Sequence, residues 1–154
     1  MSSENRIRAG AAHARQVSSD LREKAARVVS DSAAIRARSE ALLILLVEDH
    51  HDSAEALRRL LVLEGHDVVV AENVHDAERA CHNSHFTNLL CDLGLPDGSG
   101  LDLVRTVKRL CPGIRTVALT GYGMPADIEA AARAGFDAHL LKPVTQQQVL
   151  TVLQ

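Results

Sequence analysis

The sequence predicts an α/β fold, a doubly wound parallel sheet of five strands with one added helix at the N-terminal end. Three observations support it. From residue 42 onward, short aliphatic runs alternate with amphipathic segments. Several of these runs are apolar throughout, which is typical of parallel strands covered on both faces. The 154 residues, 46% of them hydrophobic, suffice for one ordinary domain with an extra element.

The expected strands and helices alternate in strict order along the chain. We expect strands at Leu42–Val47, His66–Ala71, Asn88–Asp92, Thr116–Thr120 and Ala138–Leu141. We expect helices at Asp52–Leu63, Val74–Cys81, Leu101–Leu110, Ala126–Ala134 and Thr145–Leu153. A loop rich in glycine and proline separates the third strand from the next helix. Right-handed crossovers make the flavodoxin-like strand order 2-1-3-4-5 the default topology.

Local signals define several of the element boundaries. Asp52 is the predicted N-cap of its helix, because Glu55 follows three residues later as in a capping box. Gly65 is expected to end that helix, and Pro112 with Gly113 to end a later one. The predicted helices thus begin and end at residues that favour helix boundaries.

The N-terminal segment is expected to be a separate helix. Residues 12–40 contain neither proline nor glycine. Apolar residues recur there every seven positions: Ala14, Leu21, Val28, Ile35 and Leu42. The stripe is narrow, so the helix could pack on the domain or pair with a second copy. We therefore divide the chain into a helical extension, residues 1–40, and a domain, residues 41–154.

Composition and charge exclude several classes of protein. The formal net charge of −3 argues against a nucleic-acid partner, although residues 1–41 hold 8 basic and 5 acidic side chains. No apolar run approaches the roughly 20 residues that a membrane span needs. No secretory signal is visible at the N-terminus, and the three cysteines suggest free thiols. We expect a cytoplasmic protein without a membrane partner.

Polar residues follow four of the expected strands. Glu48 and Asp49 end the first strand, Asp92 the third and Thr120 the fourth, and Lys142 follows the fifth. In the order 2-1-3-4-5 these groups meet in one crevice at the carboxyl edge of the sheet. Three crowded carboxylates need a cation, and a set of oxygen ligands suits Mg²⁺. Such a site fits an aspartate that receives a phosphoryl group, steadied by a hydroxyl and a lysine.

Four motifs carry a family resemblance: LLVEDHHDS, LLCDLGLPDGSGLDL, VALTGYG and HLLKPV. They occur in this order between Ala41 and Leu153. This segment resembles a response-regulator receiver domain of two-component signalling. The resemblance implies that Asp92 accepts phosphate from a sensor histidine kinase or a histidine phosphotransfer protein. It implies that Thr120 and Lys142 respond to the phosphoryl group, and that a downstream protein reads the change. The implied Mg²⁺ ligands are Glu48, Asp49, Asp92 and the backbone carbonyl of Gly94.

Two further positions are defined by the same resemblance. Thr120 and His139 are the expected switch pair, although His139 stands where many receivers carry a tyrosine or phenylalanine that rotates inward on activation. Because of this departure, we expect the loop after the fourth strand, from Gly121 onward, to carry more of the conformational change than a rotating ring. Pro143 follows Lys142, at a peptide bond that is often cis in this family.

The role implied is a signalling switch or phosphorelay intermediate, not an enzyme that turns over a substrate. The terminal receiver of a hybrid sensor kinase is an alternative. A haloacid-dehalogenase-type phosphatase is a more remote one, because it needs a second acid where Gly94 stands. A homodimer could form through the N-terminal helix or through the last strand and helix.

Overall fold

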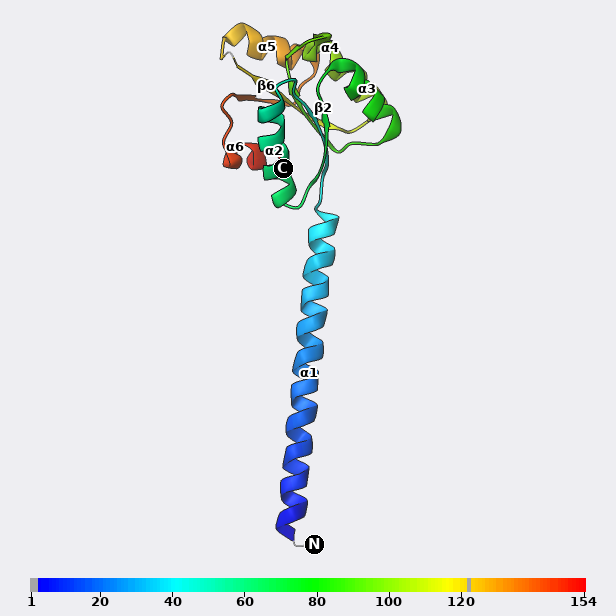
Figure 1. The fold of residues 1–154 in the computed structure, drawn as a ribbon, viewed down its shortest axis with the longest axis vertical. Coiled ribbons are helices and arrows are strands. Elements are labelled where there is room, and N and C mark those ends of the chain that lie inside the picture. The colour runs from blue at the N-terminus through cyan, green and yellow to red at the C-terminus, as the bar shows by residue number, and fades with distance from the viewer. Residues whose placement is uncertain (1–2, 122) are drawn as a thin grey trace. The chain divides into compact units, whose positions relative to one another are not determined.

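The computed structural model describes residues 3–121 and 123–154. The chain divides into two compact units, Met1–Glu40 and Ala41–Gln154. The first unit contains a single long helix, α1 (Ser3–Ser39), and the second contains the sheet and the other helices (Figure 1).

The second unit is built on a five-stranded parallel sheet. Its strands are β1 (Leu43–Val47), β2 (Asp67–Ala71), β3 (Asn88–Asp92), β6 (Arg115–Thr120) and β7 (Ala138–Leu141). Their order is β2-β1-β3-β6-β7, so the predicted order of the five strands is confirmed. The register pairs Val47 with Cys91 and Asp92 with Leu119. The carboxyl ends of the three central strands therefore lie level with one another.

Helices cover both faces of this sheet (Figure 1). They are α2 (His51–Leu63), α3 (Val74–Asn83), α4 (Gly100–Leu110), α5 (Pro125–Ala134) and α6 (Gln146–Leu153). Alternate residues of β1 point to opposite faces: Ile44 and Leu46 pack with α2 and α6, whereas Leu45 and Val47 pack with α3, α4 and α5. The sheet thus separates two aliphatic cores, as the continuous apolar runs predict.

The start of α2 differs from the prediction. His50, not Asp52, is the N-cap, and its Nδ1 accepts hydrogen bonds from the backbone N–H of Ser53 at 3.4 Å and from its hydroxyl group at 3.1 Å. The helix begins one residue earlier than expected because an imidazole nitrogen can replace the usual carboxylate or hydroxyl oxygen. The expected cap at Asp52 was wrong.

The loop after β3 contains a short hairpin that was not expected from its glycine and proline content. Two-residue strands, β4 (Gly94–Leu95) and β5 (Gly98–Ser99), pair in antiparallel fashion around Pro96 and Asp97. The backbone N–H of Gly100 then donates to the carbonyl of Leu93 at 2.9 Å. The loop is therefore a closed, hydrogen-bonded unit.

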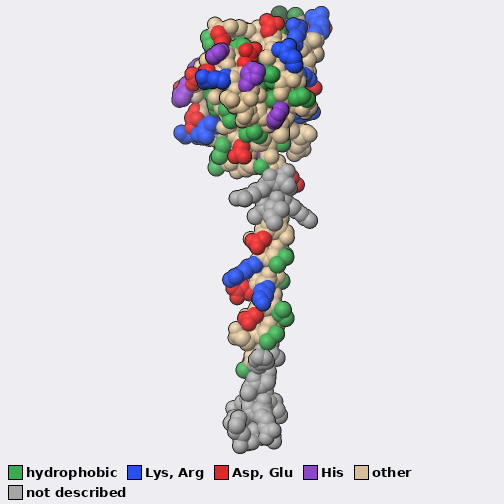
Figure 2. Space-filling view, turned by 90° about the vertical axis from the view of Figure 1, so that its right-hand side faces the viewer, with side chains coloured by type: hydrophobic (Ala, Val, Ile, Leu, Met, Phe, Trp, Pro, Cys, Tyr) green, Lys and Arg blue, Asp and Glu red, His purple; other side chains and the backbone are tan. Residues whose placement is uncertain are grey.

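The described side chains of α1 between residues 15 and 32 are all exposed. Leu21 and Val28 of the predicted stripe are 62% and 64% exposed. Figure 2 shows hydrophobic side chains gathered along one side of the helix. The side chains of Ala14 and Ile35 lie outside the described residues. Within the described part of the chain, no helix is long and apolar enough to cross a bilayer.

Candidate functional site

The polar residues at the strand ends meet at one edge of the sheet. Glu48 follows β1 directly, and its backbone N–H donates to the carbonyl of Ala71 at 3.0 Å, which continues the pairing of β1 with β2. Asp92 and Thr120 are the last residues of β3 and β6. Because β1, β3 and β6 are neighbours, parallel pairing alone places these three side chains together.

Lys142, which lies much later in the chain, contacts two of these side chains. Its Nζ donates to Oε2 of Glu48 at 2.5 Å and to Oδ2 of Asp92 at 2.7 Å. Its backbone N–H also donates to the carbonyl of Thr120 at 2.8 Å. Burial opposes the charged ammonium group, but the hydrogen bonds from Lys142 to both carboxylates outweigh it and raise its pKa above the ordinary value. The lysine is therefore a permanent positive charge in the site.

Three carboxylates form a cluster with the chemistry of a divalent metal site. Glu48, Asp49 and Asp92 each offer an oxygen, and these oxygens lie within 4.8 Å of one another. The side chain of Glu48 is only 4% exposed, so its negative charge is shielded little by water. One ammonium group cannot balance three carboxylates, and a hard divalent cation such as Mg²⁺ fits a set of oxygen ligands. The residues present therefore fit a bound Mg²⁺.

Backbone groups orient two of these carboxylates. The N–H of His50 donates to Oε1 of Glu48 at 3.1 Å, and the N–H of Gly94 donates to Oδ1 of Asp92 at 3.2 Å. Each carboxylate thus has one oxygen held by the backbone and the other held by Lys142. The arrangement fixes both side chains while leaving Asp92 18% exposed.

A hollow of about 320 Å³ opens beside Asp92. It is lined by Asp92, Leu93, Gly94, Thr120, Gly121, Asp127 and Lys142. An added Cβ at Gly94 would meet no atom within 4 Å, so this side of the hollow is open. Sequence reasoning missed Asp127, an acidic residue in the first turn of α5. Its signal in the sequence, an acid at a helix start, is common and carries no specific meaning.

The two positions expected from the family resemblance, Pro143 and His139, lie within three residues of Lys142 along the chain. The peptide bond between Lys142 and Pro143 is cis. His139 lies on β7 with its side chain exposed, paired in register with Ala118 of β6. Thr120, by contrast, is buried at 4% exposure.

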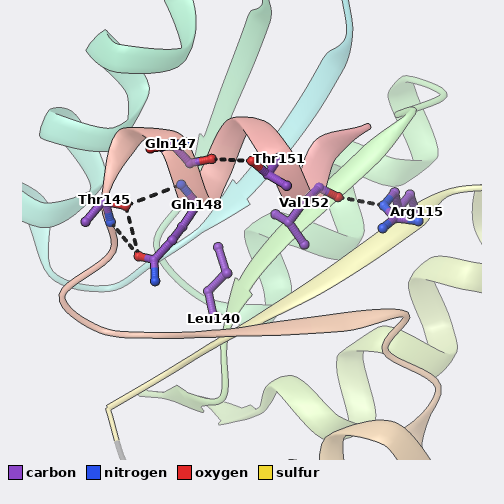
Figure 3. Close-up of a pocket in the computed structure, with 7 residues that line it drawn as sticks. All are labelled: Arg115, Leu140, Thr145, Gln147, Gln148, Thr151 and Val152. Atoms are coloured by element: carbon purple, nitrogen blue, oxygen red, sulfur yellow. Dashed lines mark hydrogen bonds between the residues drawn. The ribbon is translucent and has the colours of Figure 1, made fainter.

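A second, open groove of about 570 Å³ lies between β7 and α6 (Figure 3), and none of its described lining residues also lines the hollow beside Asp92. Leu140 forms its floor, and Thr145, Gln148 and Thr151 of the α6 segment form one wall. Arg115 lies at its far end, where Nε donates to the carbonyl of Val152 at 2.7 Å. The groove is lined by uncharged side chains apart from Arg115.

A family model for the response regulator receiver domain matches residues 44–154. The chain belongs to this family. Its α/β fold is that of a receiver domain of two-component signalling systems.

Curated relatives agree with this assignment. A response regulator receiver protein of Anaeromyxobacter sp. is 35% identical over 69% of this chain, which spans 44% of that relative. The photosynthetic apparatus regulatory protein RegA of Rhodobacter capsulatus is 32% identical over 71% of this chain, which spans 60% of RegA. The chain thus covers about half of the length of these two relatives.

Solved structures of receiver domains share the fold. A Burkholderia pseudomallei response regulator with a phosphorylated aspartic acid and a calcium ion is 32% identical, with a TM-score of 0.70 over 73% of this chain and 66% of that one. The receiver domain of the Pseudomonas aeruginosa sensor histidine kinase PA1611, with magnesium in its active-site cleft, is 25% identical. Its TM-score is 0.67 over 74% of this chain and 95% of that one.

Proposed function

We propose that this protein is a phosphorylation-dependent switch of a two-component system or phosphorelay, with Asp92 as the phosphoacceptor. The observation that carries the proposal is the contact of Lys142 with both Asp92 and Glu48 inside the acidic cluster. In the transfer, an oxygen of Asp92 bonds to the phosphorus of a phosphohistidine. The bond from phosphorus to the imidazole nitrogen breaks, and its electron pair stays on the ring.

We assign the metal to the residues of the cluster. Glu48, Asp49, Asp92 and the backbone carbonyl of Gly94 would hold Mg²⁺, which would neutralise the oxygens of the phosphoryl group. Lys142 supplies a positive charge beside Asp92, so the incoming oxygens meet an ammonium group already in place. Thr120 lines the same hollow, and its hydroxyl group would donate a hydrogen bond to a phosphoryl oxygen.

Relatives support a sensor histidine kinase or a histidine phosphotransfer protein as the phosphodonor. Receiver domains interact with histidine kinases and downstream effectors. The sensory/regulatory protein RpfC of Xanthomonas campestris is 30% identical over 77% of this chain, which spans 17% of RpfC. This match favours, as a second candidate, the terminal receiver of a hybrid sensor kinase. The haloacid-dehalogenase-type alternative is not supported, since Gly94 stands where its second acid would be.

We further propose that a change at Thr120 and His139 transmits phosphorylation to a downstream protein target. His139 and Leu141 on β7 are exposed, so a partner protein could bind this face of the domain.

We also propose a homodimer, formed either through α1 or through β7 and α6. The exposed apolar residues of α1 support the first form, and the groove in Figure 3 supports the second. We place the protein in the cytoplasm, with residues 1–40 as an extension separate from the receiver domain 41–154.

Labelling with acetyl phosphate and Mg²⁺, followed by intact mass, tests the proposed function. We expect one added phosphoryl group in the wild-type protein, its loss on addition of a chelator, and no label in Asp92→Asn. Asp102→Asn is the matched control, because Asp102 is 81% exposed on α4 and should label normally. A label that persists in Asp92→Asn, or that forms without a divalent cation, would contradict the assignment.

A further inference from the structure

We propose that Asp97 is a positioning residue for the phosphoacceptor site. Its carboxylate ties the loop that follows Asp92 to the N-terminus of α3. The inference rests on the proposed function, because the role given to the loop is to hold Gly94 beside Asp92.

The first link is the set of hydrogen bonds at the start of α3. The backbone N–H groups of Val74 and His75 donate to the two carboxylate oxygens of Asp97, at 2.7 and 3.0 Å. The side-chain oxygen of Asn73, the N-cap, accepts from the N–H of Asp76, at 2.8 Å, and not from those of Val74 and His75. A helix cannot satisfy its own first N–H groups, so those of Val74 and His75 depend on a residue more than 20 positions away. The loop completes the cap of α3.

The second link runs from Asp97 back to the acidic cluster. Asp97 lies at the turn of the β4–β5 hairpin, whose strands pair Gly94 with Ser99 and Leu95 with Gly98. Gly94, at the start of this hairpin, donates its N–H to Asp92. The hairpin is therefore hydrogen-bonded to α3 through Asp97 at its turn and to Asp92 through Gly94 at its first residue. Movement at the turn would shift the Gly94 carbonyl, a proposed Mg²⁺ ligand.

Close packing and charge hold the turn against the helix. A Cβ at Gly98 would lie 3.1 Å from Cγ2 of Val74, so the hairpin backbone touches the first residue of α3. The hydrogen bonds from Val74 and His75 lower the pKa of Asp97, as expected for a carboxylate at the positive end of a helix. Because Asp97 is exposed, its removal cuts the tether without opening a cavity.

The experiment compares Asp97→Ala with Asn73→Ala in the full chain. Both variants remove a side-chain cap from the same helix, but only the first frees the loop. Mg²⁺ affinity is measured by calorimetry, and acetyl-phosphate labelling by intact mass. We expect Asp97→Ala to weaken Mg²⁺ binding about tenfold, and Asn73→Ala to stay within about a factor of two. Asp97→Asn keeps one acceptor oxygen and should fall between them.

Hydrogen exchange of the amides of residues 93–99 provides a readout independent of labelling. It should accelerate in Asp97→Ala and not in Asn73→Ala. Equal Mg²⁺ affinities and equal exchange in the two variants would overturn the positioning role and leave Asp92 as acceptor untouched. A wild-type protein that binds Mg²⁺ but takes no label would defeat the proposed function, while the comparison of affinities would still decide the role of Asp97.

Discussion

Lys142 stands between two carboxylates that would otherwise repel each other. Glu48 is almost fully buried, and a buried carboxylate without a partner is costly. The raised pKa of Lys142 follows from hydrogen bonds that outweigh the cost of its own burial. At the scale of single residues, Lys142 thus offsets part of the negative charge of Glu48 and Asp92, the two carboxylates that it contacts.

Lys142→Ala should lower the free energy of unfolding in the absence of metal by about 1–3 kcal/mol, because it leaves Glu48 and Asp92 uncompensated. Added Mg²⁺ should then stabilise the variant more than it stabilises the wild type, since the cation replaces the lost positive charge. Urea unfolding with and without Mg²⁺ measures both effects. Lys108→Ala is the control: it removes an ion pair with Asp137, 3.1 Å away, and should respond to Mg²⁺ like the wild type.

Asp137 accepts hydrogen bonds from Thr116 on β6 and from Lys108 on α4. These contacts should make the stability of the protein depend on pH. Burial would raise its pKa, but hydrogen bonds from the backbone N–H and hydroxyl of Thr116 and from Lys108 prevail and lower it from the ordinary 3.8. A lowered folded-state pKa stabilises the protein above pH 3.8, and this contribution is lost as the pH falls through the folded-state value.

Asp137→Asn should therefore cost stability at pH 7, by less than about 1 kcal/mol because water screens a side chain that is 38% exposed, and it should lose less than the wild type as the pH falls below 3.8. Chemical unfolding at several pH values gives the two curves. Parallel curves would contradict the prediction. The exposed Asp102→Asn variant serves as a reference for the loss of a carboxylate in general.

At the scale of elements, the start of α4 is set by the lack of a side chain at Gly100. A Cβ there would lie 2.5 Å from the carbonyl oxygen of Asp92 and 3.1 Å from Sγ of Cys91. The helix can approach the end of β3 this closely only with glycine at the contact. Since the carbonyl oxygen is backbone, no side-chain rotation relieves the clash.

Gly100→Ala should thus lower the unfolding free energy by about 1–3 kcal/mol and slow the labelling of Asp92 by acetyl phosphate. Gly94→Ala is the matched variant, because its Cβ would meet open space. It should keep wild-type stability within about 0.5 kcal/mol. Thermal unfolding of both variants is the check, and equal losses would refute the steric explanation.

The elements themselves were largely predictable, and their contacts across loops were not. Aliphatic runs such as Leu43–Val47 report burial on both faces, which is a local property of the sequence. The cap of α2 by His50 and the cap of α3 by Asp97 depend on side-chain geometry and on a contact between distant segments. Periodicity carries no information on such contacts, so they escaped the prediction.

At the scale of the whole molecule, the gathering of Glu48, Asp92, Thr120 and Lys142 followed from strand order alone. Each residue ends or follows a strand, and parallel strands end at one edge. The short distances from Lys142 to both acids did not follow from this rule, because a lysine can reach several positions. Asp127, on α5, lay outside the rule and was missed.

The exposed stripe of α1 predicts self-association of the full chain. Leu21→Ser together with Val28→Ser should reduce any dimer, because both residues lie on the stripe and are more than half exposed. Val29→Ser is the control, since Val29 is 69% exposed but off the stripe. Light scattering over a range of concentrations measures the mass. A concentration-independent monomer in the wild type would exclude this use of α1.

The residues of the contact between Lys142 and its two acids are synthesised at different times, because they lie far apart along the chain. Lys142 lies 94 residues after Glu48 and 50 after Asp92, so the ribosome makes both acids well before the lysine that contacts them. A nascent polypeptide that ends before Lys142 carries the acceptor carboxylate without its lysine. The site around Asp92 is therefore completed only after Lys142, near the end of the chain, has been synthesised.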